Sequence, residues 1–209
     1  MEVCRESRKN NYERENRSVN LTREGTMKCI ECRIPDIKLF EPKRFFDERG
    51  WMMECYHADD LCFFGVNENF IQENHAYTRL AGTIRGLHFQ MPPCAQTKLV
   101  RCTSGKSVHA AVDIRPDSDT FGQWILEELS AVNGRLLYIP RGFAHGYLTK
   151  ADHTEVQWRL DMPYIPKAAK SLYYADPALN IPWGIGDPIL SEKDSRKKAL
   201  SWGRLKRIL

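Results

Sequence analysis

Short segments that mix apolar and polar residues follow one another between residues 27 and 148. Glycine, proline, asparagine or aspartate separates them at intervals of 8 to 15 residues, and no helical periodicity lies between them. Many short strands at this spacing are typical of a β-sandwich or barrel, so the pattern predicts an all-β fold. The expected strands are DIKLFEP, GWMMECY, NFIQENHAYT, GTIRGLHFQ, TKLVRCTSG, SVHAAVDIRP, WILEELS, RLLYIP and AHGYLT.

The two ends of the chain have a different composition. Residues 1–26 are polar and charged, with too little apolar surface to offset the entropy of ordering, and we predict a disordered N-terminal arm. Residues 27–209 are expected to form a single domain, since one all-β domain can reach this length. A helical turn is expected over residues 59–64. The segment LSEKDSRKKALSWGRLKRI at 190–208 predicts a C-terminal helix packed outside the barrel.

Composition narrows the possible partners. The net charge of +4 is small and scattered, which disfavours a nucleic-acid partner and suits a small anionic ligand. No apolar run approaches the roughly 20 residues that a bilayer span requires, so we expect a soluble, cytoplasmic protein with no membrane partner. Seven cysteines without a secretory signal favour reduced thiols. Cys29 and Cys32 form a CxxC, but no second ligand pair follows, and a structural metal is not expected.

One predicted strand, GTIRGLHFQ, combines polar groups with apolar ones. Regular alternation would place Arg85, Leu87 and Phe89 on one face and His88 with Gln90 on the other. Lys98 follows His88 by ten residues, and His145 lies in the turn-like IPRGFAHGYL. A single histidine on a strand is more often a hydrogen-bonded structural residue. The joint occurrence of these histidines with Arg85 and Lys98 favours a site.

Several long motifs in order carry a family resemblance: RGLHFQMPPCAQTKLVRC, VDIRPDSDTFGQW, LSAVNGRLLYIPRGFAHGY, DPALNIPW and LSEKD. From about Phe40 to Asp194 the sequence resembles the dTDP-4-dehydrorhamnose 3,5-epimerase family. The resemblance implies a cupin-type jelly-roll barrel, a homodimer with strands exchanged between subunits, and no metal or other cofactor. The implied substrate is a nucleoside-diphosphate 4-keto-6-deoxy sugar, with dTDP the favoured nucleotide, inverted at C3 and C5.

The resemblance also assigns roles to individual residues. His88 matches the family's catalytic base, and Asp194 matches the carboxylate paired with it. Lys98 matches the cation near the C4 oxygen of the sugar, and Tyr164 in MPYIP matches the acid on the opposite face. His145 matches a histidine of the pocket. The segments that resemble the nucleotide and diphosphate contacts, or cap the base, contain Phe45, Arg49, Glu54, Gln72, Asn74 and Arg85.

These residue types suit the implied chemistry. A ketone at C4 acidifies the hydrogens at C3 and C5, because the resulting carbanion delocalises onto the carbonyl oxygen as an enolate. A histidine with a reference pKa of about 6.5 can accept that proton near pH 7, and a buried carboxylate would stabilise the imidazolium that forms. A lysine would meet the charge on the enolate oxygen. Inversion needs a second group on the other face, and a tyrosine, with a reference pKa of about 10, holds its proton until the enolate forms.

The sequence departs from the family pattern around the expected sugar. Trp158 stands six residues before Tyr164, where the family usually has another tyrosine, and an indole cannot act as an acid. His109 stands where an aspartate is common, which changes the charge near the base. The loop NHAYT lacks the usual serines, and KAAK follows Tyr164 where an acidic residue is frequent. Inversion at C3 alone, or an altered sugar, is therefore a second hypothesis.

Other functions on the same barrel remain open. His88, His109 and His145 would form a three-histidine metal site in a metal-dependent cupin, although the usual signature places two histidines close together on one strand. A non-catalytic sugar-nucleotide binding protein or a ketoisomerase is a further alternative. The set of His88, Lys98, Tyr164 and Asp194 favours the epimerase.

Overall fold

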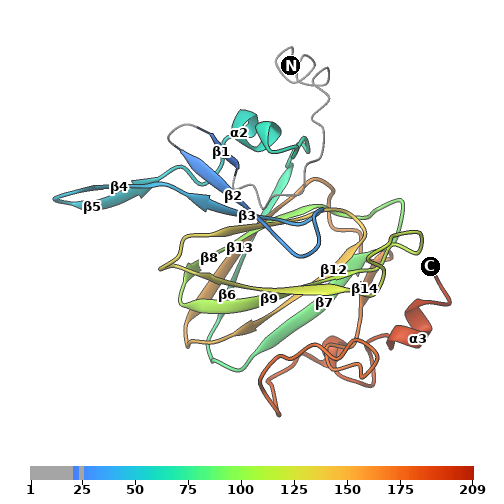
Figure 1. The fold of residues 1–209 in the computed structure, drawn as a ribbon. Helices are drawn as coiled ribbons and strands as arrows, with labels where there is room; N and C mark the ends of the chain where they lie inside the picture. The colour runs from blue at the N-terminus through green and yellow to red at the C-terminus, as the bar shows by residue number, and fades with distance from the viewer. Residues whose placement is uncertain (1–20, 24–25) are drawn as a thin grey trace.

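Two antiparallel sheets face each other in the computed structural model, which describes residues 21–23 and 26–209 (Figure 1). The larger sheet contains, in spatial order, β1 (Leu21–Arg23), β2 (Met27–Glu31), β3 (Lys38–Pro42), β11 (Leu136–Ile139), β8 (Lys98–Ser104), β13 (Thr154–Leu160) and β6 (Gln72–Thr78). The smaller sheet contains β10 (Trp124–Ser130), β9 (Lys106–Asp113), β12 (Phe143–Thr149), β7 (Ile84–Gln90) and β14 (Ala169–Ser171). The predicted all-β fold is confirmed.

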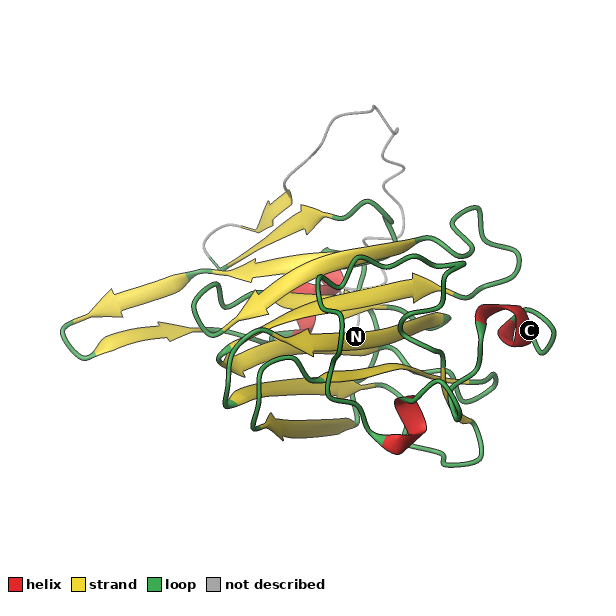
Figure 2. Cartoon of the chain, turned by 90° about the horizontal axis from the view of Figure 1, so that it is seen from below, coloured by secondary structure: helices red, strands yellow, loops and turns green. Residues whose placement is uncertain are grey.

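The helices are short and lie outside the two sheets (Figure 2). They are α2 (Ala58–Phe63), the 3-10 turn η2 (Glu192–Asp194) and α3 (Trp202–Leu205). The helical turn predicted at 59–64 corresponds to α2. The predicted C-terminal helix is present as α3 but is confined to Trp202–Leu205, and the rest of 190–208 consists of the turn η2 and other turns and bends. No helix in the described ranges is long and apolar enough to cross a membrane.

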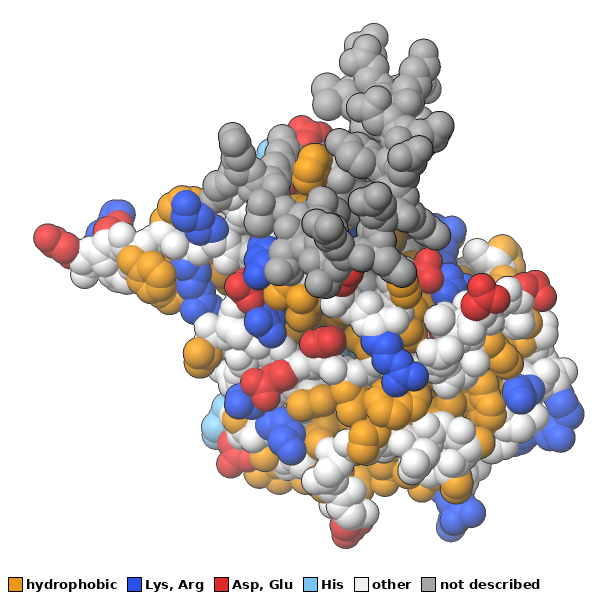
Figure 3. Space-filling model, in the orientation of Figure 1, with side chains coloured by type: hydrophobic (Ala, Val, Ile, Leu, Met, Phe, Trp, Pro, Cys, Tyr) orange, Lys and Arg blue, Asp and Glu red, His pale blue; other side chains and the backbone are white. Residues whose placement is uncertain are grey.

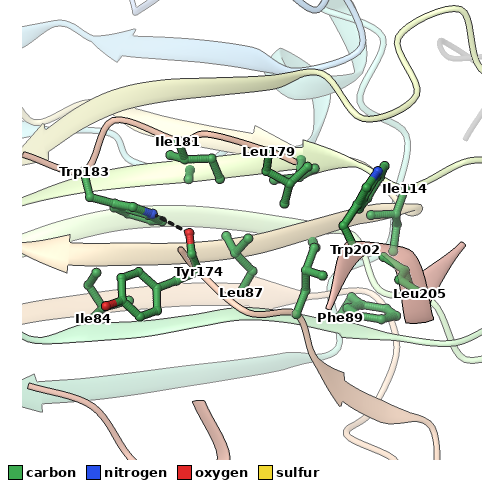
Figure 4. Packing of buried hydrophobic residues seen from close by; sticks show 14 of the residues in the cluster. Ile84, Leu87, Phe89, Ile114, Tyr174, Leu179, Ile181, Trp183, Trp202 and Leu205 are labelled. Atoms are coloured by element: carbon green, nitrogen blue, oxygen red, sulfur yellow. Dashed lines mark hydrogen bonds between the residues drawn. The ribbon is translucent and has the colours of Figure 1, made fainter. Parts of the chain in front are cut away.

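The space between the sheets holds one apolar cluster, built from Leu39 of β3, Val100 of β8, Leu137 of β11 and Val156 of β13, among others. A second cluster covers the outer face of the smaller sheet (Figure 4). It combines side chains of that sheet with residues of the C-terminal segment, namely Leu172, Tyr174, Leu179, Ile181, Trp183, Trp202 and Leu205. Every residue of β12 is buried because this sheet is covered on both faces.

The C-terminal segment is also hydrogen-bonded to the sheet that it covers. The Ile84 amide donates to the Ile189 carbonyl at 3.0 Å, and the Ile189 amide donates to the Gly82 carbonyl at 2.9 Å. Leu172 and Leu87 exchange backbone bonds at 2.8 and 3.2 Å. These contacts bring residues 189–194 beside β7, more than a hundred positions away in the sequence.

The side chains of β7 do not alternate regularly between the two faces of the sheet. Its pairing with β12 shifts register, since His145 lies opposite His88 but Tyr147 lies opposite Arg85. Gly86 sits in this bulge with φ +119, and a Cβ there would lie 2.6 Å from the Gly146 Cα, so only glycine fits. The extra residue turns Arg85 toward the side of His88, and the predicted placement of Arg85 with Leu87 and Phe89 is wrong.

A hairpin of β4 (Arg44–Asp47) and β5 (Gly50–Met53) projects away from both sheets (Figure 1). Phe46, Trp51 and Met52 are 74%, 49% and 63% exposed, and apolar side chains are visible along this projection in Figure 3. An isolated two-stranded hairpin with exposed aromatic residues is marginally stable by itself.

Other sequence predictions have mixed outcomes. The strands β2, β4, β13 and β14 were not expected. Within the arm predicted as disordered, Leu21–Arg23 forms β1 and pairs with β2, while residues 1–20 and 24–25 lie outside the described part. Five cysteines, Cys29, Cys32, Cys55, Cys94 and Cys102, are free thiols as expected. Cys62 is disulfide-bonded, so the prediction of reduced thiols is wrong at this position.

Candidate active site

A cavity of about 990 Å³ opens between the two sheets and the C-terminal segment. Its wall includes eight of the residues predicted from the sequence, and these are Asn74, Arg85, His88, Lys98, His145, Trp158, Tyr164 and Asp194. They come from β6, β7, β8, β12, β13, the loop after β13 and η2. The fold thus gathers residues that lie far apart in the sequence around one space of ligand size.

His88 and Asp194 form the closest polar pair in this wall. His88 Nε2 lies 2.6 Å from Asp194 Oδ1, and the carboxyl side chain is 2% exposed whereas the imidazole is 32% exposed. Burial, with smaller contributions from Lys193 and Lys98, lowers the pKa of His88 below its ordinary value, although the hydrogen bond and charge of Asp194 oppose this. His88 is therefore neutral near pH 7 and donates from Nε2 to the carboxylate, which leaves Nδ1 as its basic nitrogen.

Asp194 is held by four donors. Besides His88 it accepts from the Ser171 hydroxyl at 3.0 Å, the Ser191 hydroxyl at 2.9 Å and the Gly86 amide at 3.3 Å. Burial raises the pKa of Asp194, but the bonds from His88, Ser191 and Ser171 outweigh this and the pKa is lowered. Asp194 is thus an ionised, fixed carboxylate.

Lys98 lies in the floor of the cavity, 7% exposed, and its ammonium donates to the His88 carbonyl at 3.0 Å. Burial lowers the pKa of Lys98 to about 8. No carboxylate pairs with it in the described part of the chain. A buried cation with spare donors is suited to meet a negative charge that develops on a bound ligand.

The family model described as dTDP-4-dehydrorhamnose 3,5-epimerase matches residues 31–201. The chain belongs to this family. A dTDP-4-dehydrorhamnose 3,5-epimerase from Shigella flexneri is 42% identical over 169 residues, which are 80% of this chain and 93% of the relative. As a member of the epimerase family, the protein is an isomerase.

Two solved epimerase structures share this fold. That of dTDP-4-dehydrorhamnose 3,5-epimerase from Bacillus anthracis, with TDP and PPi bound, has a TM-score of 0.79 at 46% identity and covers 80% of this chain and 96% of its own. That of dTDP-6-deoxy-D-glucose-3,5-epimerase from Legionella pneumophila, in complex with dTDP-4-keto-L-rhamnose, has a TM-score of 0.77 at 38% identity and covers 80% and 89%. The predicted cupin-type jelly-roll barrel is confirmed.

The loop with Tyr164 forms one rim of the epimerase cavity. Tyr164 is 58% exposed. Gln90 anchors the loop, since its amide donates to the Pro163 carbonyl at 3.2 Å and its oxygen accepts from the Ile165 amide at 2.6 Å. Gln72 accepts from the Tyr164 amide at 3.2 Å, so this residue supports the rim.

Trp158 lies on β13 directly opposite Asn74 on β6. With the Asn74 amide oriented to satisfy both of its ends, its oxygen accepts a hydrogen bond from Trp158 Nε1 at 3.2 Å. The indole N–H is therefore used within the wall, and the ring presents an apolar surface to the cavity.

His145 and His109 lie one behind the other. His145 lines the cavity, whereas His109 is fully buried behind it and does not reach the cavity. His109 Nδ1 lies 3.0 Å from His145 Nε2. The prediction that His109 borders the substrate directly has to be refined, since it contacts the wall residue instead.

Besides Gln72 and His109, three further predicted substrate contacts do not line this cavity. Phe45 and Arg49 lie on the projecting hairpin, where Arg49 is 89% exposed and pairs with Asp47. Glu54 follows the hairpin, and its carboxylate lies within 4.8 Å of ligand atoms of His57 and Asp60. The structure of one chain does not bring these residues to His88.

The histidines of the alternative metal site do not converge. His88 Nε2 is bonded to Asp194, and His145 Nε2 is bonded to His109. Among the described residues, the group close enough to share an ion is Glu54, His57 and Asp60, none of which lines the cavity.

Sequence reasoning missed several wall residues. Ser171 and Ser191 hold Asp194, and Lys170, Lys193 and Lys198 add positive charge to the cavity. Ser191 precedes Asp194 by three residues in LSEKD, a spacing that suggests a turn bond, but nothing local to Ser171 indicates its role. Its pairing opposite His88 on β14 is visible only in the fold.

Proposed function

We propose that this protein epimerises a dTDP-linked 4-keto-6-deoxy sugar at carbons next to the ketone, through an enolate. The observation that carries the proposal is the His88–Asp194 pair beside the buried Lys98 at the base of one cavity. The relatives' names, and the ligands TDP and dTDP-4-keto-L-rhamnose in two related structures, support the same substrate class. No step in this mechanism calls for a metal or other cofactor.

The proton moves between carbon and imidazole. His88 Nδ1 takes the proton from C3 or C5 as the C–H electron pair forms the enolate, and Asp194 stabilises the resulting imidazolium. Lys98 meets the negative charge on the C4 oxygen. Protonation of the same carbon from the other face then completes the inversion.

The cavity charge suits a nucleoside diphosphate. Within the described part of the chain its wall contains Arg85, Lys98, Lys170, Lys193 and Lys198, against the carboxylates of Glu192 and Asp194. Arg85 is held by Thr78 at 3.1 Å and by the Tyr77 carbonyl at 3.1 Å, which leaves part of its guanidinium for a phosphate.

We assign the acid on the second face to Tyr164, whose loop Gln90 and Gln72 support at the cavity rim. A comparison with ChmJ, a 3'-monoepimerase from Streptomyces bikiniensis, bears on this assignment. A double variant of ChmJ, 26% identical to this chain with a TM-score of 0.77, replaces a histidine and a tyrosine 70 positions apart. His88 and Trp158 are also 70 positions apart. Trp158 cannot replace a tyrosine as acid, so the assignment rests on the Tyr164 hydroxyl.

We also propose a homodimer. The projecting hairpin exposes Phe46, Trp51 and Met52, and the hairpin region contains Phe45, Arg49 and Glu54, the expected substrate contacts that lie outside this chain's own cavity. Exchange of this hairpin with a second copy would bury the aromatic side chains and place these residues near the partner's cavity.

The test is incubation of the purified protein with dTDP-4-keto-6-deoxyglucose in deuterated water, followed by proton NMR. Deuterium at C3, C5 or both, with a change in ring coupling constants, is the expected result. Exchange without inversion would retain His88 as base and remove Tyr164 as acid. Absence of any exchange in protein that binds dTDP would favour a sugar-nucleotide binding protein.

A further inference from the structure

Behind the cavity wall, three side chains form a buried hydrogen-bonded series. Ser107 Oγ lies 2.8 Å from His109 Nε2, and His109 Nδ1 lies 3.0 Å from His145 Nε2. Ser107 and His109 are 0% exposed and His145 is 8% exposed. The two imidazole rings are stacked, with centroids 5.3 Å apart and planes 9° apart, and Tyr147 stacks on His109 with centroids 5.1 Å apart.

All the partners in this series are neutral. A hydroxyl and an imidazole both donate and accept, so Ser107 and His145 satisfy His109 without a charge on either ring. The single hydrogen bond between the rings requires one ring to donate and the other to accept. Protonation of both rings would place two donors against each other and break that bond.

The surroundings oppose a charge on these rings. Burial lowers the pKa of His109 to about 3. Burial also lowers the pKa of His145, and the charge of Lys98, together with any proton on His109 or His88, lowers it further. The titratable groups near the pair are His88 on β7, Lys98 and Cys102 on β8, Tyr147 on β12 with Arg85 close to it, and Glu127 on β10, the register partner of His109. Burial raises the pKa of Glu127, and its carboxyl group makes no hydrogen bond to either ring among the described contacts.

We propose that His109 is a positioning residue that holds His145 in the cavity wall as an uncharged imidazole of fixed orientation. This inference rests on the proposed function and concerns the electrostatics of the same site. With His145 uncharged, Lys98 is the cation closest to the position of the enolate oxygen. A charged His145 would repel the Lys98 ammonium and shift its titration to lower pH.

The experiment compares two variants at position 109 that match each other in size and differ in charge. His109→Asp supplies a buried carboxylate that would stabilise an imidazolium at His145, and His109→Asn is the matched uncharged control. The imidazole signals of His145 are followed by NMR between pH 5 and pH 8 in the wild type and both variants, assigned with His145→Asn. This readout needs no turnover, so it is independent of the proposed epimerase activity.

In the wild type and in His109→Asn, the His145 signals should not titrate over this range, whereas in His109→Asp they should. Only His109→Asp places a buried charge near Lys98, so its profile of turnover against pH should differ from that of His109→Asn. His109→Asn should lower turnover less than about tenfold, corresponding to roughly 1.4 kcal/mol, the upper range for one neutral hydrogen bond.

Titration of wild-type His145 between pH 5 and pH 8 would overturn the proposal, even if neither variant folds. Identical pH profiles for folded His109→Asp and His109→Asn would overturn it as well, because a purely structural role predicts no dependence on charge at this position.

Discussion

Two histidines of the smaller sheet, His88 and His145, each form a hydrogen-bonded pair with another side chain, and the two partners differ in charge. His88 is bonded to an ionised carboxylate at 2.6 Å, whereas His145, opposite His88 in the sheet, is bonded to the neutral His109 at 3.0 Å. A carboxylate stabilises an imidazolium, and a neutral imidazole does not. The first pair is therefore suited to accept a proton, and the second is suited to remain uncharged.

Exposure strengthens the difference between the two pairs. The His88 side chain is 32% exposed and can meet a substrate carbon, whereas His109 is completely enclosed. Identical side chains on adjacent strands thus acquire different properties from one partner residue and from the solvent. Reading a histidine's role requires both observations.

The largest expected effect comes from removing the base of the first pair. His88→Asn should lower deuterium exchange at C3 and C5 by about 10²- to 10⁴-fold, the usual contribution of a positioned general base. Binding of dTDP, measured by calorimetry, should change little. Exchange close to the wild-type rate would remove the proposed mechanism, whereas loss of exchange together with loss of dTDP binding would point to misfolding.

Lys98 lies beside both pairs, and its removal should be the next largest effect. Lys98→Ala should lower kcat by roughly 10²- to 10³-fold, with a smaller change in KM, because its best contact forms with the enolate. The wild-type rate should also fall above a pH of about 8, where Lys98 loses its proton. A variant affected in KM alone would indicate that Lys98 binds substrate without stabilising the enolate.

Asp194→Asn makes the first pair resemble the second, because His88 then has an uncharged partner. Asp194 raises the pKa of His88 against the effect of burial, so the variant's His88 pKa should be lower still. Since the reaction needs neutral His88, the acidic limb of kcat/KM should move to lower pH. The rate itself should fall on the order of 10- to 10²-fold, as for outer partners that orient a functional histidine. An acidic limb that does not move would show that another group causes it.

The smallest expected effect concerns which carbon reacts. Trp158 is bulkier than a tyrosine and its N–H is bonded to Asn74, so it should restrict how the sugar lies over His88. We expect deuterium to enter C3 faster than C5 in the wild type. Trp158→Tyr should narrow that difference by a few-fold, which corresponds to about 1 kcal/mol, the lower end of what one altered pocket contact contributes. Equal exchange at both carbons in the wild type would show that Trp158 imposes no restriction.

The sequence was sufficient to predict site residues and strands where the local pattern and a motif agree. His88, Lys98, His145 and Asp194 were expected from their motifs, and all four lie in one cavity wall. The strands with alternating or apolar stretches were found within a few residues. β13 was missed although Val156, Trp158 and Leu160 alternate there, because its polar neighbours obscured the pattern.

The sequence was insufficient where distant segments determine the outcome. The face of the sheet on which Arg85 lies depends on the bulge at Gly86. Only glycine fits in this bulge, because the backbone of Gly146 lies close to it. Residues 190–208 have a charged composition that favours a helix, but apolar contacts of Ala199, Trp202 and Leu205 hold them against the barrel in another conformation. The position of Arg49 depends on a hairpin whose destination no local pattern reveals.

Local opening of the C-terminal segment would determine which fraction of the molecules has a complete catalytic pair. Asp194 is held at His88 only while residues 172–205 cover the smaller sheet, and the backbone bonds of Ile189 with Ile84 and Gly82 join the two. Detachment of this segment as one cooperative unit, without unfolding of the barrel, would leave His88 in place but without its carboxylate. The protection of the Ile84 and Ile189 amides against hydrogen exchange therefore measures the fraction of molecules that hold a complete proton-transfer pair.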